Sequence, residues 1–193
     1  GWARVVQAIL AAWVAPATFL AARRWARSGV YENGCCGVAL PILAGLAAAV
    51  DPFLIFFSGL MLTEALFAAV IVTAWLFVMP LVDQVSPHRL RQAVIAGVLL
   101  LLAVMLRPSA AVLVMVTVAW TCASRGLCVQ RIRSAALILL VVVAGLMPWA
   151  ARNRAVIGEW RWLTTRSGIS LYDGMQPGAT GGSDLAHTKA IPQ

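Results

Sequence analysis

Residues 60–82 read LMLTEALFAAVIVTAWLFVMPLV, and Glu64 is the only charged side chain among them. A transmembrane helix needs about 20 consecutive apolar residues to cross the ~30 Å hydrocarbon core of a bilayer. The stretch has this length and this composition, so it predicts a membrane-spanning helix. A helix that is apolar on all faces must be surrounded by lipid or by other apolar helices.

Further apolar stretches lie on both sides of this one, at residues 4–22, 36–50, 90–106, 109–124 and 134–151. Together they predict an all-α, polytopic transmembrane helical bundle of about six spans. The stretch at 36–50 contains Pro41 and is the weakest of the six. Two interpretations stay open for it: it spans the membrane with the help of residues 51–57, or it is a broken helix.

The composition supports a membrane protein and excludes other classes. Of 193 residues, 62% are apolar and 11% are charged, against about 45–50% and about 25% in soluble domains. A disordered chain, a disulfide-rich secreted module and an ordinary soluble enzyme are therefore excluded. The 15 basic residues outnumber the 7 acidic ones, but a chain this apolar cannot present the broad basic face that nucleic acid requires. No nucleic-acid partner is expected.

The basic residues indicate an orientation, because positive charge marks the cytoplasmic loops of membrane proteins. They gather in alternate loops, at Arg23, Arg24, Arg27, Arg89, Arg91, Arg125, Arg131 and Arg133. The intervening loops, near 51–59 and 107–108, contain only Arg107. We therefore expect Asp51, Arg107 and the chain after Ala151 to lie on the outer, extracytoplasmic side.

Two regions are predicted along the chain. Residues 1–154 form the transmembrane region, and residues 155–193, rich in Gly, Ser and Thr, form an extracytoplasmic loop segment. The sequence begins with Gly1 in an apolar stretch and ends with Gln193 in a polar one. We expect it to be an internal piece of a longer protein, with the loop segment incomplete.

Glu64 is the sharpest candidate for chemistry. A charged side chain at the centre of a membrane helix costs about 2.5–3.5 kcal/mol on insertion scales. One interpretation is structural: Thr63 caps the helix and Glu64 is a first-turn acid stabilised by the helix dipole. The other is functional: Glu64 faces a cavity, where it binds a substrate hydroxyl, orients a nucleophile or holds a metal.

Other charged residues of the outer face have the same two kinds of interpretation. Asp51 precedes Pro52 and favours a turn between helices. Arg107 and Arg152 either reach the lipid headgroups or bind an anion. Arginine suits phosphate because its planar guanidinium makes two parallel hydrogen bonds.

Several chemistries are excluded by missing motifs. The sequence contains no P-loop, no H-E-x-x-H and no G-x-G-x-x-G. A membrane protease of the Ser–His type is not evident either. Ser58 is expected on the outer face, whereas His88 is expected on the cytoplasmic side and His187 in the tail.

Residues 51–67, DPFLIFFSGLMLTEALF, resemble the Ser-Gly-…-Thr-Glu-…-Leu-Phe pattern of polytopic membrane glycosyltransferases. These belong to the GT-C superfamily, which includes protein O-mannosyltransferases and aminoarabinose transferases. Three further blocks are similar to the family in the same order: LRP at 106–108, PWAARN at 148–153, and SLYDG at 170–174 followed by Gly181-Gly182. The resemblance covers roughly residues 2–184.

The resemblance implies a transferase of the bacterial plasma membrane whose site faces the extracytoplasmic side. A sugar passes from a polyprenyl-phosphate donor to a lipid, glycan or protein acceptor. Glu64 matches the family's acid near the active site, and Arg152, followed by Asn153, matches a residue that faces the donor phosphate. Arg107 and Tyr172 are weaker substrate-binding candidates. Ser170 stands where the family usually has Asn.

The resemblance also implies that part of the site is missing from this sequence. The family's usual catalytic aspartate lies in an outer loop before the helix that opens the chain, so the chain alone is expected to be inactive. The metal dependence stays open, with a divalent ion as one option. In an inverting transfer a carboxylate deprotonates the acceptor hydroxyl, and cations stabilise the leaving phosphate.

Two other classes compete with the transferase. A transporter or flippase for lipid-linked or anionic substrates would also carry intramembrane charges and broken helices. It should show charges near mid-membrane and repeated halves, whereas here the charges lie at one face and no repeat is found. A structural membrane subunit without a site is the third interpretation, and Glu64 with the outer arginines argues against it.

Overall fold

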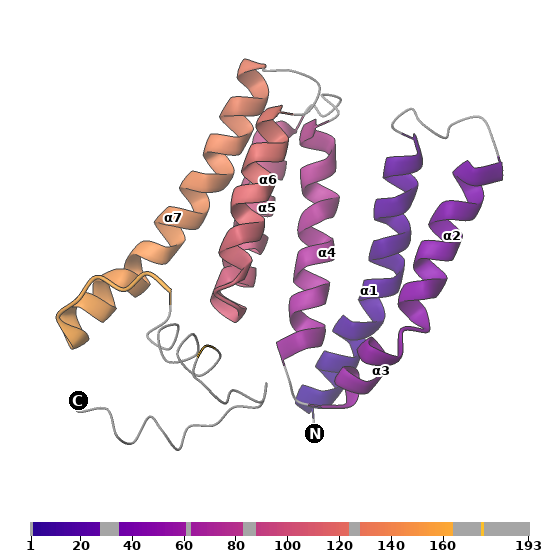
Figure 1. The fold of residues 1–193 in the computed structure, drawn as a ribbon, viewed down its shortest axis with the longest axis horizontal. Helices are drawn as coiled ribbons and strands as arrows, with labels where there is room; N and C mark the ends of the chain where they lie inside the picture. Colours follow the sequence, from indigo (N-terminus) through magenta and orange to yellow (C-terminus); the bar gives the residue numbers. More distant parts are fainter. Residues whose placement is uncertain are drawn as a thin grey trace. The chain divides into compact units, whose positions relative to one another are not determined.

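The computed structural model describes residues 2–27, 35–60, 63–82, 88–123, 128–163 and 175. All secondary-structure elements in these ranges are α-helices. The helices are α1 (Trp2–Arg27), α2 (Cys35–Ala49), α3 (Pro52–Gly59), α4 (Thr63–Val82), α5 (Arg89–Leu106), α6 (Ala110–Ala123) and α7 (Val129–Ile157) (Figure 1). The predicted all-α class is therefore confirmed for the described residues. The chain divides into two compact units, residues 1–147 and 148–193, and α7 begins in the first and ends in the second. The predicted division at 154/155 stays a prediction.

Four of the described helices are long and apolar enough to cross a membrane: α1 (from Arg4), α4, α5 and α7. A fifth crossing is possible if α2 and α3, which are bent by 41° to each other, act as one span. Helix α6 is apolar but has only 14 residues, a length of about 21 Å against the ~30 Å of a hydrocarbon core. The chain is an integral membrane protein, and the count of six spans stays a prediction.

Two helices are longer than their apolar stretches. The first continues from residue 22 to Arg27, and the last begins at Val129 and ends at Ile157 rather than covering 134–151. Arginine is a good helix former, and its long side chain can leave the hydrocarbon while its backbone stays helical. The apolar stretch therefore ends before the helix does, and hydropathy alone underestimates the length of these two helices.

The weak second stretch is broken at residues 50 and 51. Asp51 is the N-cap of α3, and its carboxylate accepts hydrogen bonds from the backbone N–H of Phe53 at 2.8 Å and of Leu54 at 3.1 Å. Pro52 follows at the first helical position, where its missing N–H leaves no bond unmade. The Asp-Pro pair therefore ends one helix and starts another.

In the first unit, α1 packs against α2 and α4, and α4 packs against α5. Figure 1 shows these helices side by side, with the C-terminal ends of α1, α4 and α6 at the top and α3 at the bottom. Gly97 lets α5 approach the first part of α7, since a Cβ added there would lie 2.9 Å from Cβ of Val141. Small residues permit such close contacts between membrane helices.

Arg24 shows that an arginine near the end of an apolar helix can have a structural role. Pro80 lies within α4 and has no N–H to donate to the carbonyl of Leu76, four residues earlier. The guanidinium of Arg24 in α1 donates a hydrogen bond to that carbonyl oxygen. Arg89 similarly donates to the carbonyl oxygen of Leu81, in the last turn of α4, at 2.6 Å. The two arginines therefore satisfy backbone oxygens at the end of α4.

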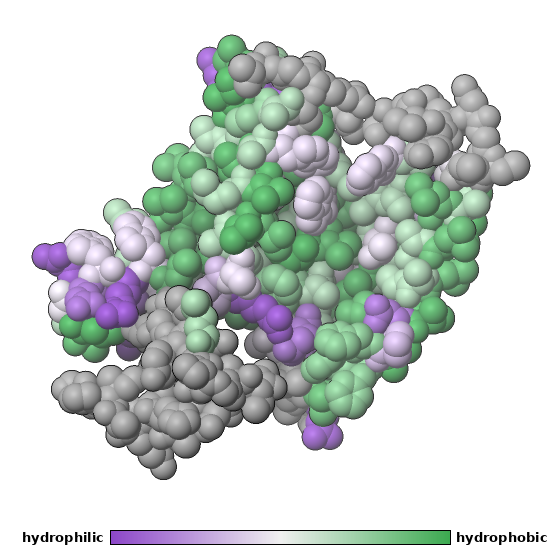
Figure 2. All heavy atoms as spheres, viewed as in Figure 1, coloured by the Kyte–Doolittle hydropathy of each residue, from purple (hydrophilic) through white to green (hydrophobic). Residues whose placement is uncertain are grey.

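The outward surface of the helices is apolar. Large apolar side chains are exposed along them, among them Ile9, Val38, Leu43, Phe56, Val98, Val112 and Leu140. Figure 2 shows hydrophobic colour over the flanks of the helices, with hydrophilic residues near their ends. A surface this apolar is stable in lipid rather than in water.

Candidate functional site

The structure brings Glu64 and Arg107 together at the end of the first unit where α4 begins and α5 ends. Glu64 lies in the first turn of α4, and Arg107 is the C-cap of α5. Nη2 of Arg107 forms a salt bridge with Oε1 of Glu64. The side chains are 40% exposed for Arg107 and 26% for Glu64, so the pair sits at a partly open surface.

Phe67 completes the surroundings of this pair. It lies one helical turn after Glu64 on α4, and the guanidinium carbon of Arg107 is 5.4 Å from its ring centroid. A cation over an aromatic face is attracted by the negative charge density of the ring. Arg107 is therefore held by a carboxylate and by a ring, both from α4.

The second carboxylate oxygen of Glu64 is in a different situation. Oε2 is buried, and no hydrogen-bond donor within the described ranges reaches it. A buried carboxylate oxygen is a strong acceptor whose lost hydration is compensated only by a donor. Oε1 thus joins α4 to α5 through Arg107, and Oε2 can accept a hydrogen bond from a ligand.

Both interpretations of Glu64 apply to the same side chain. Its place in the first turn is favoured by the positive end of the helix dipole. Its pairing with Arg107 joins two helices. Neither role uses Oε2, which keeps the functional interpretation open.

Gln7 belongs to the same end of the unit, and the sequence gives little reason to choose it. Its side-chain amide, on α1, donates to the carbonyl oxygen of Phe57 at 3.1 Å and to that of Leu60. Both acceptors lie at the end of α3, where carbonyls have no partner within the helix. Gln7 thereby ties α1 to the end of α3. A polar amide in an apolar stretch is the one signal that could have pointed to it.

A cavity of about 310 Å³ opens between α1, α2 and α3. Its lining is Ala8, Ala11, Ala12, Ala15, Ala48, Ala49, Leu54, Ile55 and Ser58. Neither Glu64 nor Arg107 lines it. The hydroxyl of Ser58 donates to the carbonyl oxygen of Ile55 at 2.7 Å, so its proton is already bonded within α3.

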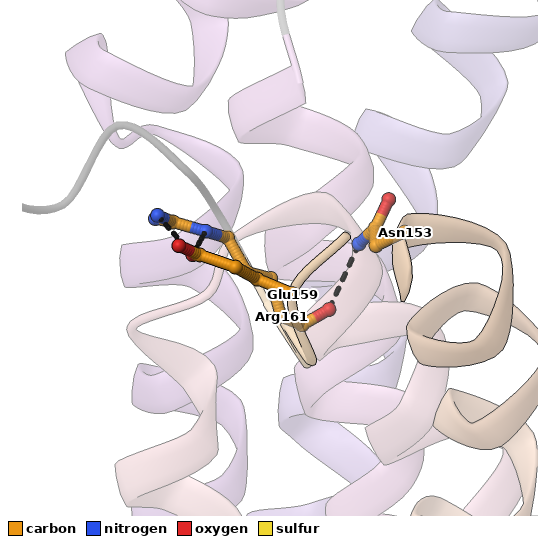
Figure 3. A network of polar contacts seen from close by, with 3 residues as sticks. All are labelled: Asn153, Glu159 and Arg161. Carbon is orange, nitrogen blue, oxygen red and sulfur yellow. Dashed lines mark hydrogen bonds and ion pairs between the residues drawn. The ribbon is translucent and has the colours of Figure 1, made fainter. Parts of the chain in front are cut away.

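The second unit contains Arg152 and Asn153. Arg152 is exposed, with its guanidinium carbon 5.6 Å from the ring centroid of Trp149. Asn153 is only 5% exposed, and its amide donates to the carbonyl oxygen of Arg161 at 2.8 Å (Figure 3). The Arg161 side chain pairs with Glu159 (Figure 3). Asn153 therefore holds the chain that follows α7, whereas the Arg152 cation faces outward.

The remaining candidates do not add to the site. Tyr172 and Ser170 lie outside the described residues. The carboxylate of Asp51 caps α3. Within the described part of the chain, no group of three or more His, Cys, Asp or Glu side chains could hold a metal ion.

Comparisons with known proteins give no relative to set beside this geometry: no family model, no curated protein and no solved structure matches the chain.

Proposed function

We propose that the chain is part of an integral-membrane glycosyltransferase of the bacterial plasma membrane. It transfers a sugar from a polyprenyl-phosphate donor to an acceptor at the extracytoplasmic face. In this proposal the chain crosses the membrane six times, and the segment after α7 is extracytoplasmic. In the proposed reaction a carboxylate other than Glu64 deprotonates the acceptor hydroxyl.

The observation that carries the proposal is that the two carboxylate oxygens of Glu64 have different surroundings. Oε1 is fixed by Arg107, which sets the orientation of the carboxylate, and Oε2 is buried without a hydrogen-bond donor from the described residues. A sugar or acceptor hydroxyl is such a donor. A carboxylate oxygen that is already oriented and partly shielded from water binds a hydroxyl group more strongly than a water-exposed carboxylate does. Glu64 would therefore position the hydroxyl, rather than act as the base.

Arg152 supports the proposal from the second unit. It is exposed, and no carboxylate within the described ranges pairs with it. A guanidinium can make two hydrogen bonds to a phosphate and stabilise the negative charge of the leaving group. In the proposed reaction this charge develops on the polyprenyl phosphate as the glycosidic bond breaks.

The test is a transfer assay on the protein expressed from its native gene and reconstituted in liposomes. The donors are polyprenyl-phosphate sugars labelled in the sugar. We expect Glu64→Gln to lower kcat by about 10²-fold, a loss of transition-state stabilisation of about 2.7 kcal/mol. Arg152→Gln should lower the rate as well. The matched control is Asp51→Asn, the same carboxylate-to-amide change at a helix cap. Transfer that is undiminished in Glu64→Gln overturns the role of the acid.

A transporter or flippase remains a second candidate because of one observation. Helices α2 and α3 meet at a 41° bend, and broken helices are the elements that form substrate sites in transporters. In sealed liposomes a flippase moves labelled polyprenyl phosphate across the bilayer and forms no new glycosidic bond. Movement without a transfer product in wild-type protein would therefore favour this candidate.

A further inference from the structure

Helix α7 ends in a turn that reverses the chain. Gly158 follows Ile157 with φ +83°, a left-handed backbone conformation that residues other than glycine rarely adopt. Its N–H donates to the carbonyl oxygen of Arg154 at 2.9 Å, as in a left-handed C-cap. The helix therefore stops abruptly and the chain is free to turn back.

Two side chains of α7 then hold the returning chain against the helix. Asn153 donates to the carbonyl oxygen of Arg161 at 2.8 Å, and Nε1 of Trp149 donates to that of Leu163 at 3.3 Å. Trp149 and Asn153 are four residues apart and share one face of the helix. Later residues of the return bond to earlier residues of the helix, so the chain runs back along α7. We call residues 149–163 the return segment.

The return segment presents indole rings to its surroundings. Trp160 is 51% exposed and Trp162 is 41% exposed, and their rings stack with centroids 6.4 Å apart. Trp149 is exposed as well. Indole has an apolar body and a polar N–H, and it concentrates where hydrocarbon meets headgroups. Trp149 lies within α7, an apolar helix long enough to span a membrane, and Trp160 and Trp162 follow that helix directly.

The charges of the segment are not equivalent. Arg161 makes two hydrogen bonds to Oε2 of Glu159, at 2.6 and 2.9 Å, so their charges cancel. The guanidinium of Arg154 lies 5.0 Å from the ring centroid of Trp160. No carboxylate within the described ranges pairs with Arg154. Among the described residues its positive charge is thus uncompensated, and it lies beside the exposed ring of Trp160.

We propose that the return segment is an anchor for anionic phospholipid at the membrane surface. Trp160 and Trp162 lie at the level of the headgroups, and Arg154 binds the lipid phosphate. A lipid surface fits better than a free anion, because the flanking groups are exposed rings rather than a polar enclosure. This anchor does not depend on glycosyl transfer.

The experiment compares the binding of lipids to the full chain in neutral detergent, by native mass spectrometry. The probes are phosphatidylglycerol and phosphatidylcholine. Wild-type protein should prefer phosphatidylglycerol. Arg154→Gln should weaken its binding about fivefold, the equivalent of about 1 kcal/mol for one arginine at a membrane surface. Trp160→Ala is the second variant and should weaken the binding of both lipids.

The control is the double variant Glu159→Gln/Arg161→Gln, which removes two charges and keeps the net charge. Its affinity for phosphatidylglycerol should stay within about twofold of wild type, because the pair is already neutral. Equal binding of the two lipids by wild-type protein overturns the proposal. So does displacement of the lipid by an equal concentration of inorganic phosphate, or binding of polyprenyl phosphate that is far tighter and equally lost in Arg154→Gln.

Discussion

At the scale of single residues, Asp51 shows how a charged side chain at a membrane surface can have a purely structural role. Its carboxylate caps α3 and accepts two backbone N–H groups. We predict that Asp51→Ala lowers the free energy of unfolding by about 1 kcal/mol, because a cap is lost. Asp51→Asn should be close to wild type, since asparagine caps as well as aspartate. Thermal unfolding in lipid nanodiscs measures both. A loss in Asp51→Asn equal to that in Asp51→Ala would show that the charge itself matters.

The candidate site could be predicted only in part at this scale. Composition is enough to single out Glu64 and Arg107, because charges are costly near a membrane. The sequence does not pair them, since they are 43 positions apart. Gln7 is the opposite case. Its role depends on carbonyls 50 and 53 positions away at the end of α3, and no local pattern indicates that contact.

At the scale of elements, α4 depends on an arginine from another helix. Arg24 donates to the carbonyl of Leu76, which Pro80 leaves without a partner. We predict that Arg24→Met lowers the free energy of unfolding by about 1–2 kcal/mol, because a hydrogen bond to a charged group is lost. In a Pro80→Ala background the N–H of residue 80 should bond to Leu76 instead, and the cost of Arg24→Met should fall.

Arg23→Met is the matched control, because Arg23 is an exposed neighbour of Arg24 on the same helix. It should change stability by less than about 0.5 kcal/mol. Unfolding in bicelles, followed at equilibrium, supplies the four free energies of the cycle. If Arg24→Met lowers the free energy of unfolding equally with and without Pro80, then Arg24 does not act by replacing the hydrogen bond that Pro80 cannot make to Leu76.

The break between α2 and α3 could be predicted from the sequence, unlike the contacts of Arg24. Asp-Pro is a local signal: the residue before proline avoids the helical conformation, and aspartate caps the next helix. Pro41 does not break the first of these two helices, since α2 continues through it. A proline in a membrane helix can be tolerated where neighbours compensate its missing bond.

At the scale of the whole molecule, α6 decides whether a sixth crossing of the membrane is possible. Its 14 residues cover only part of a bilayer unless the membrane thins or the flanking residues contribute. If α6 crosses, its two ends lie on opposite sides. In the proposed orientation, we predict that Ser109→Cys reacts with a membrane-impermeant maleimide added outside intact cells, and that Gln130→Cys reacts only after permeabilisation. Both are made with Cys35, Cys36, Cys122 and Cys128 replaced by alanine. Labelling of both positions from the same side would leave five crossings at most.

The amino-acid sequence is enough to predict a helical membrane protein, and Asp51-Pro52 favours a turn between two helices. These properties depend on composition and on neighbouring residues: apolar side chains are stable in lipid wherever they pack, and an Asp-Pro cap acts within four residues. The pairing of Glu64 with Arg107 and the hydrogen bond from Arg24 to the carbonyl of Leu76 are evident only in the folded chain. They join residues 43 and 52 positions apart, so their distances are set by how the helices pack and are not encoded in any short stretch of sequence. Asn153 and Arg161 are only eight positions apart, but they meet because the turn at Gly158 closes.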